Sequence, residues 1–426
     1  MRRVPRRMLR ALLTGAFLLA LVPGCGTSVP APLVVLGPWT GAEGEAFERA
    51  LEQLDDGTGR TYTYEGTRSL RETLVSQLEA DDPPDVAILN SIGELTEYAR
   101  RDQLRPLAEE TAERAYPPWA PTLLVDGRRR TYWVPLKVDL KSLVWSRKDA
   151  SDADPTWCVG LASQATSGWP GTDWIEDILL HQAGPAVYTE WATSRLSWRD
   201  PAVRRAWTTW AHLLGKRSPA SIERSLTTSY EGTTGPDGPR GLLDSPGFPC
   251  THEHQSAFIR YVYAGADIGV QPSARFLGGP AAYRGAYEVS GDMAAVFSDD
   301  PAAQKLVERL SNPDGRARWR AEADPAVRPL FPSSTGPTPA NPTERTIDTL
   351  LTSGARTLCF DASDVMPPEI RDAFHRAVLE FFRDPAEPHL DSLLRQLETV
   401  RAQATEEPPT DRSFRPPEDL CASPGG

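Results

Sequence analysis

The chain has 426 residues, and its 46 lysines and arginines against 58 acidic residues give a formal net charge of −12 at pH 7. This acidic balance excludes nucleic acid as an expected partner, because phosphates require a basic protein surface. About 400 residues follow the N-terminal segment, which is too many for a single hydrophobic core, so two domains are expected.

The N-terminal residues have the pattern of an export signal. Five arginines among the first ten residues precede an apolar run over 11–22, and the run ends at Val22-Pro23-Gly24-Cys25. This pattern predicts a lipoprotein signal peptide over 1–24, lipid attachment at Cys25 and a tether over 25–32. Cleavage nearby and release from the cell is the alternative. We therefore expect an extracytoplasmic protein that is anchored by lipid to the outer face of the cell membrane.

Strand and helix patterns alternate along the first hundred residues. The expected strands lie at 33–36, 61–65 and 85–89, and the expected helices at 45–54, from a capping box at Ser69–Glu72, and at 94–101. Such alternation predicts a parallel sheet with crossover helices.

The rest of the chain begins with two extended pieces over 132–145, around Lys137 and Asp139. Asp173 and Glu176 are expected to form a capping pair for a helix over 173–182. The remaining expected elements are a helix over 200–215, a long loop over 227–249, a helix over 254–263, strands at 268–270 and 287–289, helices at 301–310, 373–382 and 390–400, and a polar, proline-rich tail.

Four cysteines remain after Cys25, namely Cys158, Cys250, Cys359 and Cys421. An even number of cysteines in an exported protein predicts disulfides, and four cysteines allow three connectivities. Buried free thiols are the alternative.

An ordered set of short segments resembles the extracellular solute-binding proteins of carbohydrate ABC importers (family 1), and within them the branch associated with α-glucosides. The segments are 37–43, 64–68, 83–88, 141–145, 167–177, 291–295 and 360–367, and the likeness extends from about 33 to 400.

The resemblance implies an α/β, two-lobed, periplasmic-binding-protein-like fold (type II), with parallel-core sheets, helices on both faces and an interlobe cleft. The first lobe would comprise 33–135 plus about 265–335, the second 136–264 plus about 336–402, and the tail 403–426. The resemblance also implies a Cys158–Cys250 disulfide, and Cys359 and Cys421 remain as the second pair.

A sugar needs flat aromatic surfaces for its C–H faces and fixed polar groups for its hydroxyls. Ligands of parallel sheets lie beyond the carboxyl ends of the strands. These rules and the resemblance select the expected ligand contacts, which are Trp39, Thr40, Glu43, Asn90, Lys137, Asp139, Trp169, Asp173, Trp174, Gln255 and Asp292. Trp145, Trp207 and Trp210 are expected to pack in the core.

The expected function is capture of a small carbohydrate, with an α-glucoside as the ligand of the resembling branch, for delivery to ABC permease subunits. We expect a monomer with no cofactor, no metal and no catalytic activity. The alternatives are a sensor or cell-envelope binding lobe without transport, a secreted glycan-active enzyme, and a metal site at His252-Glu253-His254.

Overall fold

The computed structural model describes residues 31–54, 60–236, 238–263, 266–332, 339, 341–354, 356–405, 414–415, 417–418 and 420–422. The expected signal peptide and Cys25 lie outside the described residues. Within the described part of the chain, no helix has both the length and the apolar character needed to cross a membrane.

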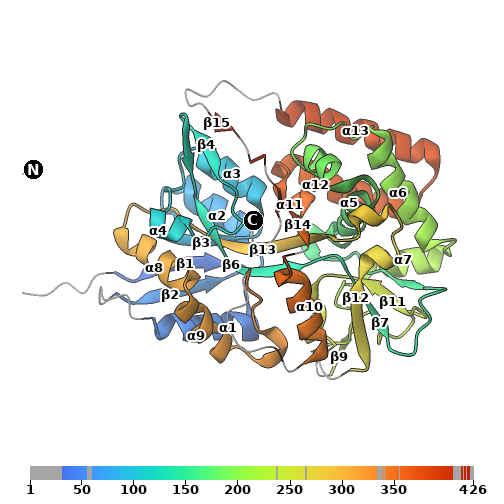
Figure 1. Cartoon of the computed structure of the whole chain (residues 1–426), viewed down its shortest axis with the longest axis horizontal. Coiled ribbons are helices and arrows are strands. Elements are labelled where there is room, and N and C mark those ends of the chain that lie inside the picture. Colours follow the sequence, from blue (N-terminus) through green and yellow to red (C-terminus); the bar gives the residue numbers. More distant parts are fainter. Residues whose placement is uncertain are drawn as a thin grey trace, which may run out of the picture. The chain divides into compact units, whose positions relative to one another are not determined.

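The larger sheet has seven strands in the order β16-β14-β13-β3-β1-β2, and β6 also pairs with β13 (Figure 1). Its strands are β1 (Leu33–Gly37), β2 (Tyr62–Gly66), β3 (Val86–Leu89), β6 (Trp133–Leu140), β13 (Ala286–Val296), β14 (Thr357–Phe360) and β16 (Cys421–Ala422). Strands β2, β1 and β3 form the expected parallel core, and β14 runs parallel to β13. Because β13 runs antiparallel to both β3 and β6, the complete sheet is mixed.

The helices that accompany this sheet include those predicted from the alternating pattern. They are α1 (Gly41–Glu52), α2 (Leu70–Glu79), α3 (Ile92–Arg100), α4 (Glu109–Ala112), α8 (Pro301–Ser311) and α9 (Pro313–Glu322). Helix α1 starts four residues before the expected position, directly after Thr40. Ser69 precedes α2 as expected, but its side chain makes no capping hydrogen bond.

The second sheet has four strands in the order β12-β7-β11-β8. The strands are β7 (Leu143–Arg147), β8 (Trp157–Cys158), β11 (His252–His254) and β12 (Ile268–Pro272). Only Lys141 and Ser142 separate β6 from β7, so this segment carries the chain from the larger sheet into the smaller one. Strand β12 comes from the stretch that the sequence assigned to the first lobe, but it pairs with β7.

The helices on the side of the smaller sheet are grouped together in Figure 1. They are α5 (Trp169–Ala192), α6 (Pro201–Leu214), α7 (Pro219–Thr227), α12 (Pro368–Arg383) and α13 (Glu387–Thr405). The remaining elements are α10 (Pro342–Thr352), α11 (Ala362–Val365), the three-stranded sheet of β4 (Leu123–Val125), β5 (Arg128–Arg130) and β15 (Phe414–Arg415), the ribbon of β9 (Thr234–Gly235) and β10 (Gly238–Pro239), and five short 3₁₀ turns among the described residues.

Two expectations about local structure are wrong. Helix α5 begins at Trp169 after Gly168, whose φ of 109° lies in the left-handed region, so Asp173 and Glu176 are inside the helix and do not form a capping pair. A Cβ on Gly168 would lie 2.3 Å from the carbonyl oxygen of His375, and this close approach also requires glycine. Residues 252–254 form strand β11 and not the start of a helix, because they pair with β7 and β8; a 3₁₀ turn follows at Ala257–Tyr261.

Aromatic side chains fill the core between α5, α6 and α12. Trp207 and Trp210 are fully buried, as expected, and Trp145 is 1% exposed. The ring of Trp207 lies 5.1 Å from that of Phe381, and the Trp191 ring lies 4.9 Å from that of Trp198. The Phe374 ring of α12 contacts Trp191 of α5 and Trp207 of α6, so these rings join the three helices.

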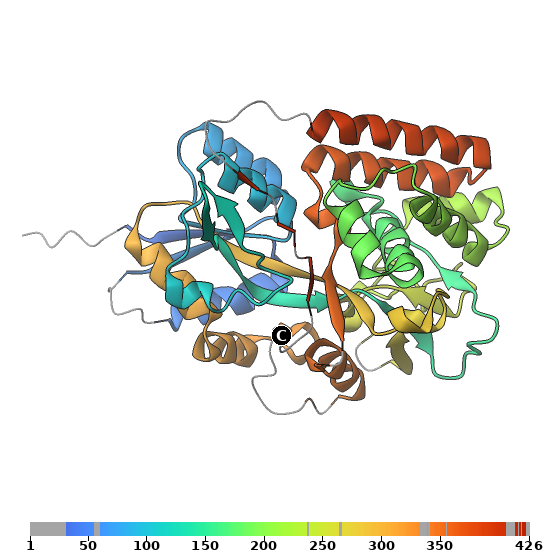
Figure 2. The ribbon, with the colours of Figure 1, turned by 45° about the horizontal axis from the view of Figure 1, so that its top comes forward.

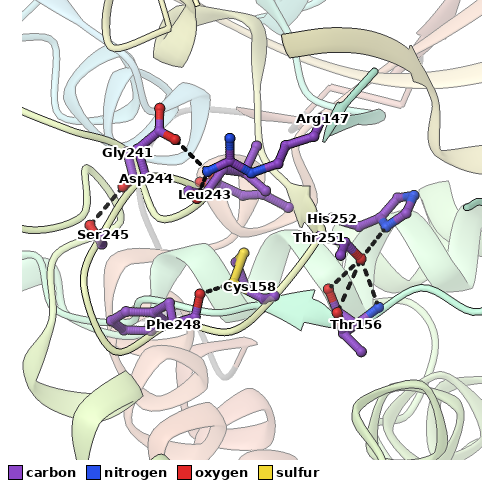
Figure 3. Close-up of a disulfide and its surroundings, with 12 residues drawn as sticks. Arg147, Thr156, Cys158, Gly241, Leu243, Asp244, Ser245, Phe248, Thr251 and His252 are labelled. Carbon is purple, nitrogen blue, oxygen red and sulfur yellow. Dashed lines mark hydrogen bonds and ion pairs between the residues drawn. A yellow bond between two sulfur atoms is a disulfide. The ribbon is translucent and has the colours of Figure 1, made fainter. Parts of the chain in front are cut away.

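Two disulfides are present in the structure. Cys158–Cys250 links β8 to the segment before β11 (Figure 3), and Cys359–Cys421 links β14 to β16. Their cysteines are 92 and 62 residues apart in the chain. Loops of this length correspond to about 4 kcal/mol of stabilisation each in the chain-entropy model.

Candidate functional site

Strands β6 and β13 of the larger sheet place Lys137 opposite Asp292, because these residues are direct partners in the β6–β13 register. Lys137 forms an ion pair with Glu43, and its Nζ lies 3.6 Å from Asp292 Oδ2. Trp39 Nε1 donates a hydrogen bond of 2.8 Å to the same Asp292 oxygen. We call Trp39, Glu43, Lys137 and Asp292 the Lys137 group. Burial alone would lower the pKa of Lys137, but the charges of Glu43 and Asp292 outweigh it and raise that pKa.

A second group surrounds Lys141, at the end of the crossing from β6 to β7. Lys141 Nζ lies 2.9 Å from Asp173 Oδ1 and 3.9 Å from Glu288 Oε1, and it also forms an ion pair with Asp361. Glu176 Oε2 accepts hydrogen bonds from the two backbone N–H groups that follow Asp361 in the chain. We call Lys141, Asp173, Glu176, Glu288 and Asp361 the Lys141 group. Its four carboxyl groups are almost completely buried.

The protonation states of the Lys141 group follow from burial and from the position of the ammonium. Burial and the neighbouring carboxylates raise the pKa values of Glu176 and Glu288 well above their ordinary range. Burial also raises the pKa of Asp173 to about 6. Burial acts in the same direction on Asp361, but Lys141 outweighs it and lowers the pKa of Asp361 to about 2. At neutral pH the buried ammonium of Lys141 is therefore balanced by ionised Asp361, whereas the Glu176 and Glu288 carboxyls are protonated and neutral.

Ligand atoms of Asp173, Glu176 and Asp361 lie within 4.8 Å of one another, a spacing that a metal ion could bridge. The ammonium of Lys141 already contacts two of these three carboxylates. It supplies the positive charge that a metal ion would otherwise provide.

Three half-buried aromatic side chains meet beside Lys141. The ring of Trp169 lies 4.8 Å from that of Tyr230 and 6.0 Å from that of Phe258, and the rings of Tyr230 and Phe258 are 5.5 Å apart. Lys141 Nζ is 5.5 Å from the centre of the Trp169 ring. We call Trp169, Tyr230 and Phe258 the aromatic cluster. Its members are partly exposed, unlike most other large aromatic side chains in the described core.

Asp139 positions one side of the aromatic cluster. Its Oδ2 accepts a hydrogen bond of 3.0 Å from the backbone N–H of Phe258, and its Oδ1 accepts one from Leu140. Burial raises the pKa of Asp139 to about 6. Asp139 is 6% exposed, so it acts on the cluster through the backbone of Phe258.

Residues that follow β1 and β2 lie within electrostatic reach of the aromatic cluster. Burial is the main cause that raises the pKa of Tyr230 to about 12, and the charges of Arg68 and Glu43 also act on its hydroxyl. Arg68 Nε donates a hydrogen bond of 3.4 Å to Thr40 Oγ1. Thr40 and Arg68 therefore meet beyond the carboxyl ends of β1 and β2, the edge at which parallel sheets bind ligands.

Asn90 follows β3 and is exposed, and its Nδ2 lies 3.3 Å from Asp364 Oδ2. The backbone beside it is also tied to α11, because Ser91 Oγ donates a hydrogen bond of 3.0 Å to the carbonyl oxygen of Asp364. The third parallel strand therefore ends against α11.

Three expected ligand contacts have no open face. Trp39 is 3% exposed and packs between Phe47 and Trp319, with ring centres 4.8 and 4.6 Å away. Trp174 is 1% exposed and lies against His254. Gln255 is 3% exposed, and its side-chain oxygen accepts a hydrogen bond from the next residue in the chain.

The ligand contacts expected from the sequence did not include Lys141, Asp361, Tyr230 or Phe258. Lys141 and Asp361 lie within segments that carry the family resemblance, so those segments contained a usable signal. Tyr230 and Phe258 lie at the start of the long loop and in a 3₁₀ turn, and no motif marks either residue.

Comparison with known proteins shows which family the chain resembles. The family model described as bacterial extracellular solute-binding protein matches residues 38–219. This part of the chain is similar to that family. The sequence-based expectation of an extracellular solute-binding protein is thereby confirmed.

Relatives extend the similarity along the chain. The alpha-glucosides-binding periplasmic protein AglE of Rhizobium meliloti is 29% identical over 392 residues, which cover 82% of this solute-binding protein and 83% of AglE. The osmoprotective compounds-binding protein GgtB of Synechocystis is 27% identical over 377 residues, which cover 79% and 84% of the two chains.

Solved structures establish the fold of this solute-binding protein. The bacterial solute receptor AcbH superposes with a TM-score of 0.62 at 13% identity, over 88% of this chain and 98% of AcbH. The two α/β parts described above are therefore the two lobes of a periplasmic-binding-protein-like fold, as expected from the sequence.

The interior of the second lobe holds the histidines considered above as metal ligands. His254 Nε2 lies 2.7 Å from Asp177 Oδ2, and His252 Nε2 lies 3.2 Å from Asp152 Oδ1. The two imidazoles therefore have separate carboxylate partners. Glu253, between them in the chain, is 1% exposed and forms a hydrogen bond with the hydroxyl of Tyr263.

Glu253 gives this solute-binding protein a predicted dependence of stability on pH. Burial raises the pKa of Glu253 from 4.5 to about 8. The folded state therefore binds the proton more tightly than the unfolded chain, and the resulting stabilisation is complete below pH 4.5 and is lost as the pH rises through about 8. The expected loss is on the order of 4 kcal/mol of unfolding free energy.

Urea unfolding between pH 5 and pH 8 measures this effect. Glu253→Gln, which cannot ionise, should reduce the slope of the pH profile, to which the raised pKa values of Glu176 and Glu288 also contribute, whereas Glu45→Gln on the exposed face of α1 should retain the wild-type slope. Parallel profiles for Glu253→Gln and the wild type would refute the assignment.

Proposed function

We propose that this solute-binding protein captures a small carbohydrate of the α-glucoside class between its lobes and delivers it to the permease subunits of an ABC importer. The aromatic cluster beside Lys141 is the observation that carries the proposal. Partly exposed rings suit the C–H faces of a sugar, and adjacent fixed charges suit its hydroxyls. Hydrogen bonds to charged groups contribute about 1.5–3 kcal/mol, against roughly 1 kcal/mol for neutral pairs.

The charge balance of the site supports an uncharged ligand. Lys137 contacts two carboxylates and Lys141 contacts three, so both ammonium groups are already balanced by the protein. An anionic solute such as a sugar phosphate would add a further negative charge beside these carboxylates, which is unfavourable in a buried setting. The similarity to AglE, whose name specifies α-glucosides, supports the narrower choice.

We also propose a monomeric binding protein without cofactor or catalytic activity, held at the outer face of the membrane by lipid on Cys25. The first lobe comprises residues 33–135 and most of the segment from about 265 to 335, with β12 added to the sheet of the second lobe. The second lobe comprises 136–264 and about 336–402.

A thermal-unfolding screen over mono-, di- and trisaccharides tests the proposal, with glucose 6-phosphate as the anionic control. A ligand at 100 times its dissociation constant stabilises the folded state by about 2.7 kcal/mol. We expect that shift for at least one α-glucoside, no shift for the phosphate, and recovery of the sugar unchanged. A flat response to every saccharide would disprove carbohydrate binding, and hydrolysed products would disprove the absence of catalysis.

A further inference from the structure

The C-terminal segment makes two separate strand pairings after α13 ends. Strand β15 is antiparallel to β4, with Phe414 opposite Val125 and Arg415 opposite Leu124. Strand β16 is antiparallel to β14, with Cys421 opposite Cys359, to which it is also disulfide-bonded. Only residues 416–420 separate these strands, so one short stretch of chain is attached at two places.

The two attachment points lie in different parts of the fold. Strand β4 and its partner β5 immediately precede β6, and Figure 1 shows them beside α3, toward the other end of β13 from α12 and α13. At the other end, Cys421 Sγ lies 3.4 Å from Thr189 Oγ1 and 3.8 Å from the carbonyl oxygen of Pro185, both in α5 of the second lobe. Figure 2 shows the dark-red strand segments between the β4–β5 hairpin and β14.

The two attachments differ in strength. At the β16 end, the disulfide is joined by a hydrogen bond of 2.8 Å from the Phe360 N–H to the carbonyl oxygen of Leu420, whose side chain is fully buried. At the β15 end, only two residues pair with β4, and so short a strand cannot persist on its own against the entropy of the free chain. A covalent anchor a few residues away supplies the high effective concentration that keeps such a weak pairing formed.

We infer that β15 and β16 act together as a strap that is latched by the Cys359–Cys421 disulfide and restrains the separation of the two lobes. The β16 end is fixed, and the β15 end is the part that must detach from β4 when the lobes move apart. The strap affects the motion of the lobes and not the identity of the ligand. Its test is therefore independent of carbohydrate binding.

Hydrogen–deuterium exchange on the ligand-free, full-length chain tests the strap at a site remote from the bridge. In Cys359→Ser/Cys421→Ser, we expect amides of residues 123–125 to exchange at least about tenfold faster than in the wild type, because β15 detaches from β4. Small-angle scattering should show a larger radius of gyration. The matched control, Cys158→Ser/Cys250→Ser, removes a disulfide that lies within the second lobe and should leave exchange at 123–125 unchanged.

A second variant tests whether β15 pairing matters apart from any local effect of the disulfide. It also provides the test if the serine variant does not fold. Phe414→Pro/Arg415→Pro keeps the disulfide but removes both backbone N–H groups of β15. It should reproduce the faster exchange at 123–125 and the larger radius of gyration. Unchanged exchange in this variant would overturn the inference, even if the serine variant exchanged faster, because the bridge would then act on β14 alone.

Discussion

Replacing Lys141 with methionine should lower the free energy of unfolding by about 3–5 kcal/mol, because it removes the cation from a buried group of carboxyls. The Lys141 side chain is 8% exposed, and those of its partners Asp173 and Asp361 are 4% and 1% exposed. Methionine retains most of the side-chain volume, so the loss of unfolding free energy reports the missing charge and not the creation of a cavity. Urea unfolding at neutral pH provides the measurement.

Lys137→Met is the matched control for this prediction. Lys137 lies on β6, which ends directly before Lys141, but its side chain is 18% exposed and that of its partner Glu43 is 29% exposed. Water can replace part of the lost interaction there, so we expect less than half of the Lys141→Met effect. Lys141→Met/Asp361→Asn should recover part of the lost stability, because it also removes the partner carboxyl with the lowest pKa in the group. Equal losses in the two methionine variants would contradict the distinction between the two groups.

Replacing Trp169 with alanine should weaken the binding of whichever saccharide stabilises the protein by at least about 30-fold, the effect of losing an interface anchor worth 2 kcal/mol. Trp169 contributes the largest ring of the aromatic cluster, and its ring lies over Lys141 as well as beside Tyr230 and Phe258. Trp169→Phe keeps a smaller flat surface and should lose less. Isothermal titration of the purified variants gives the affinities.

Trp157→Ala tests whether such a loss is specific to the site. Trp157 is also half-buried and aromatic, but it packs against Trp174 and Phe276 beside the Cys158–Cys250 disulfide. We expect wild-type affinity for this variant. Similar weakening in both alanine variants would place the aromatic cluster outside the ligand site.

Local patterns in the sequence predicted much of the first lobe. The apolar run at 33–36 and the helical spacing that follows it give β1 and α1 directly, because these elements bury one side against a parallel sheet. The start of α5 was missed because Asp173 and Glu176 match a capping pattern, whereas the structure uses both carboxyls deep inside the second lobe. Propensity could not reveal this use, since it depends on Lys141 from a distant strand.

The candidate site was only partly predictable for the same reason. Glu43 and Lys137 could be selected from their positions after a strand and on a crossing segment, but their contact with Asp292 depends on the β6–β13 register. The register shifts at an irregularity directly after Asp292, and no sequence pattern in either strand predicts this shift. The position of Trp39 in a loop suggested that its ring is exposed. The structure shows that Trp319 from α9 covers this ring, which local sequence could not reveal.

The location of Lys141 beside the crossing from β6 to β7 has a consequence for redesign. Lys141 balances buried charge, so it cannot be substituted freely to suit a new ligand, because each substitution would also lower the stability of the folded state. Tyr230 and Phe258 carry no such burden, since they sit half-exposed on a loop and a short turn. Variant libraries that aim to change the ligand should therefore randomise Tyr230 and Phe258 and keep Lys137 and Lys141.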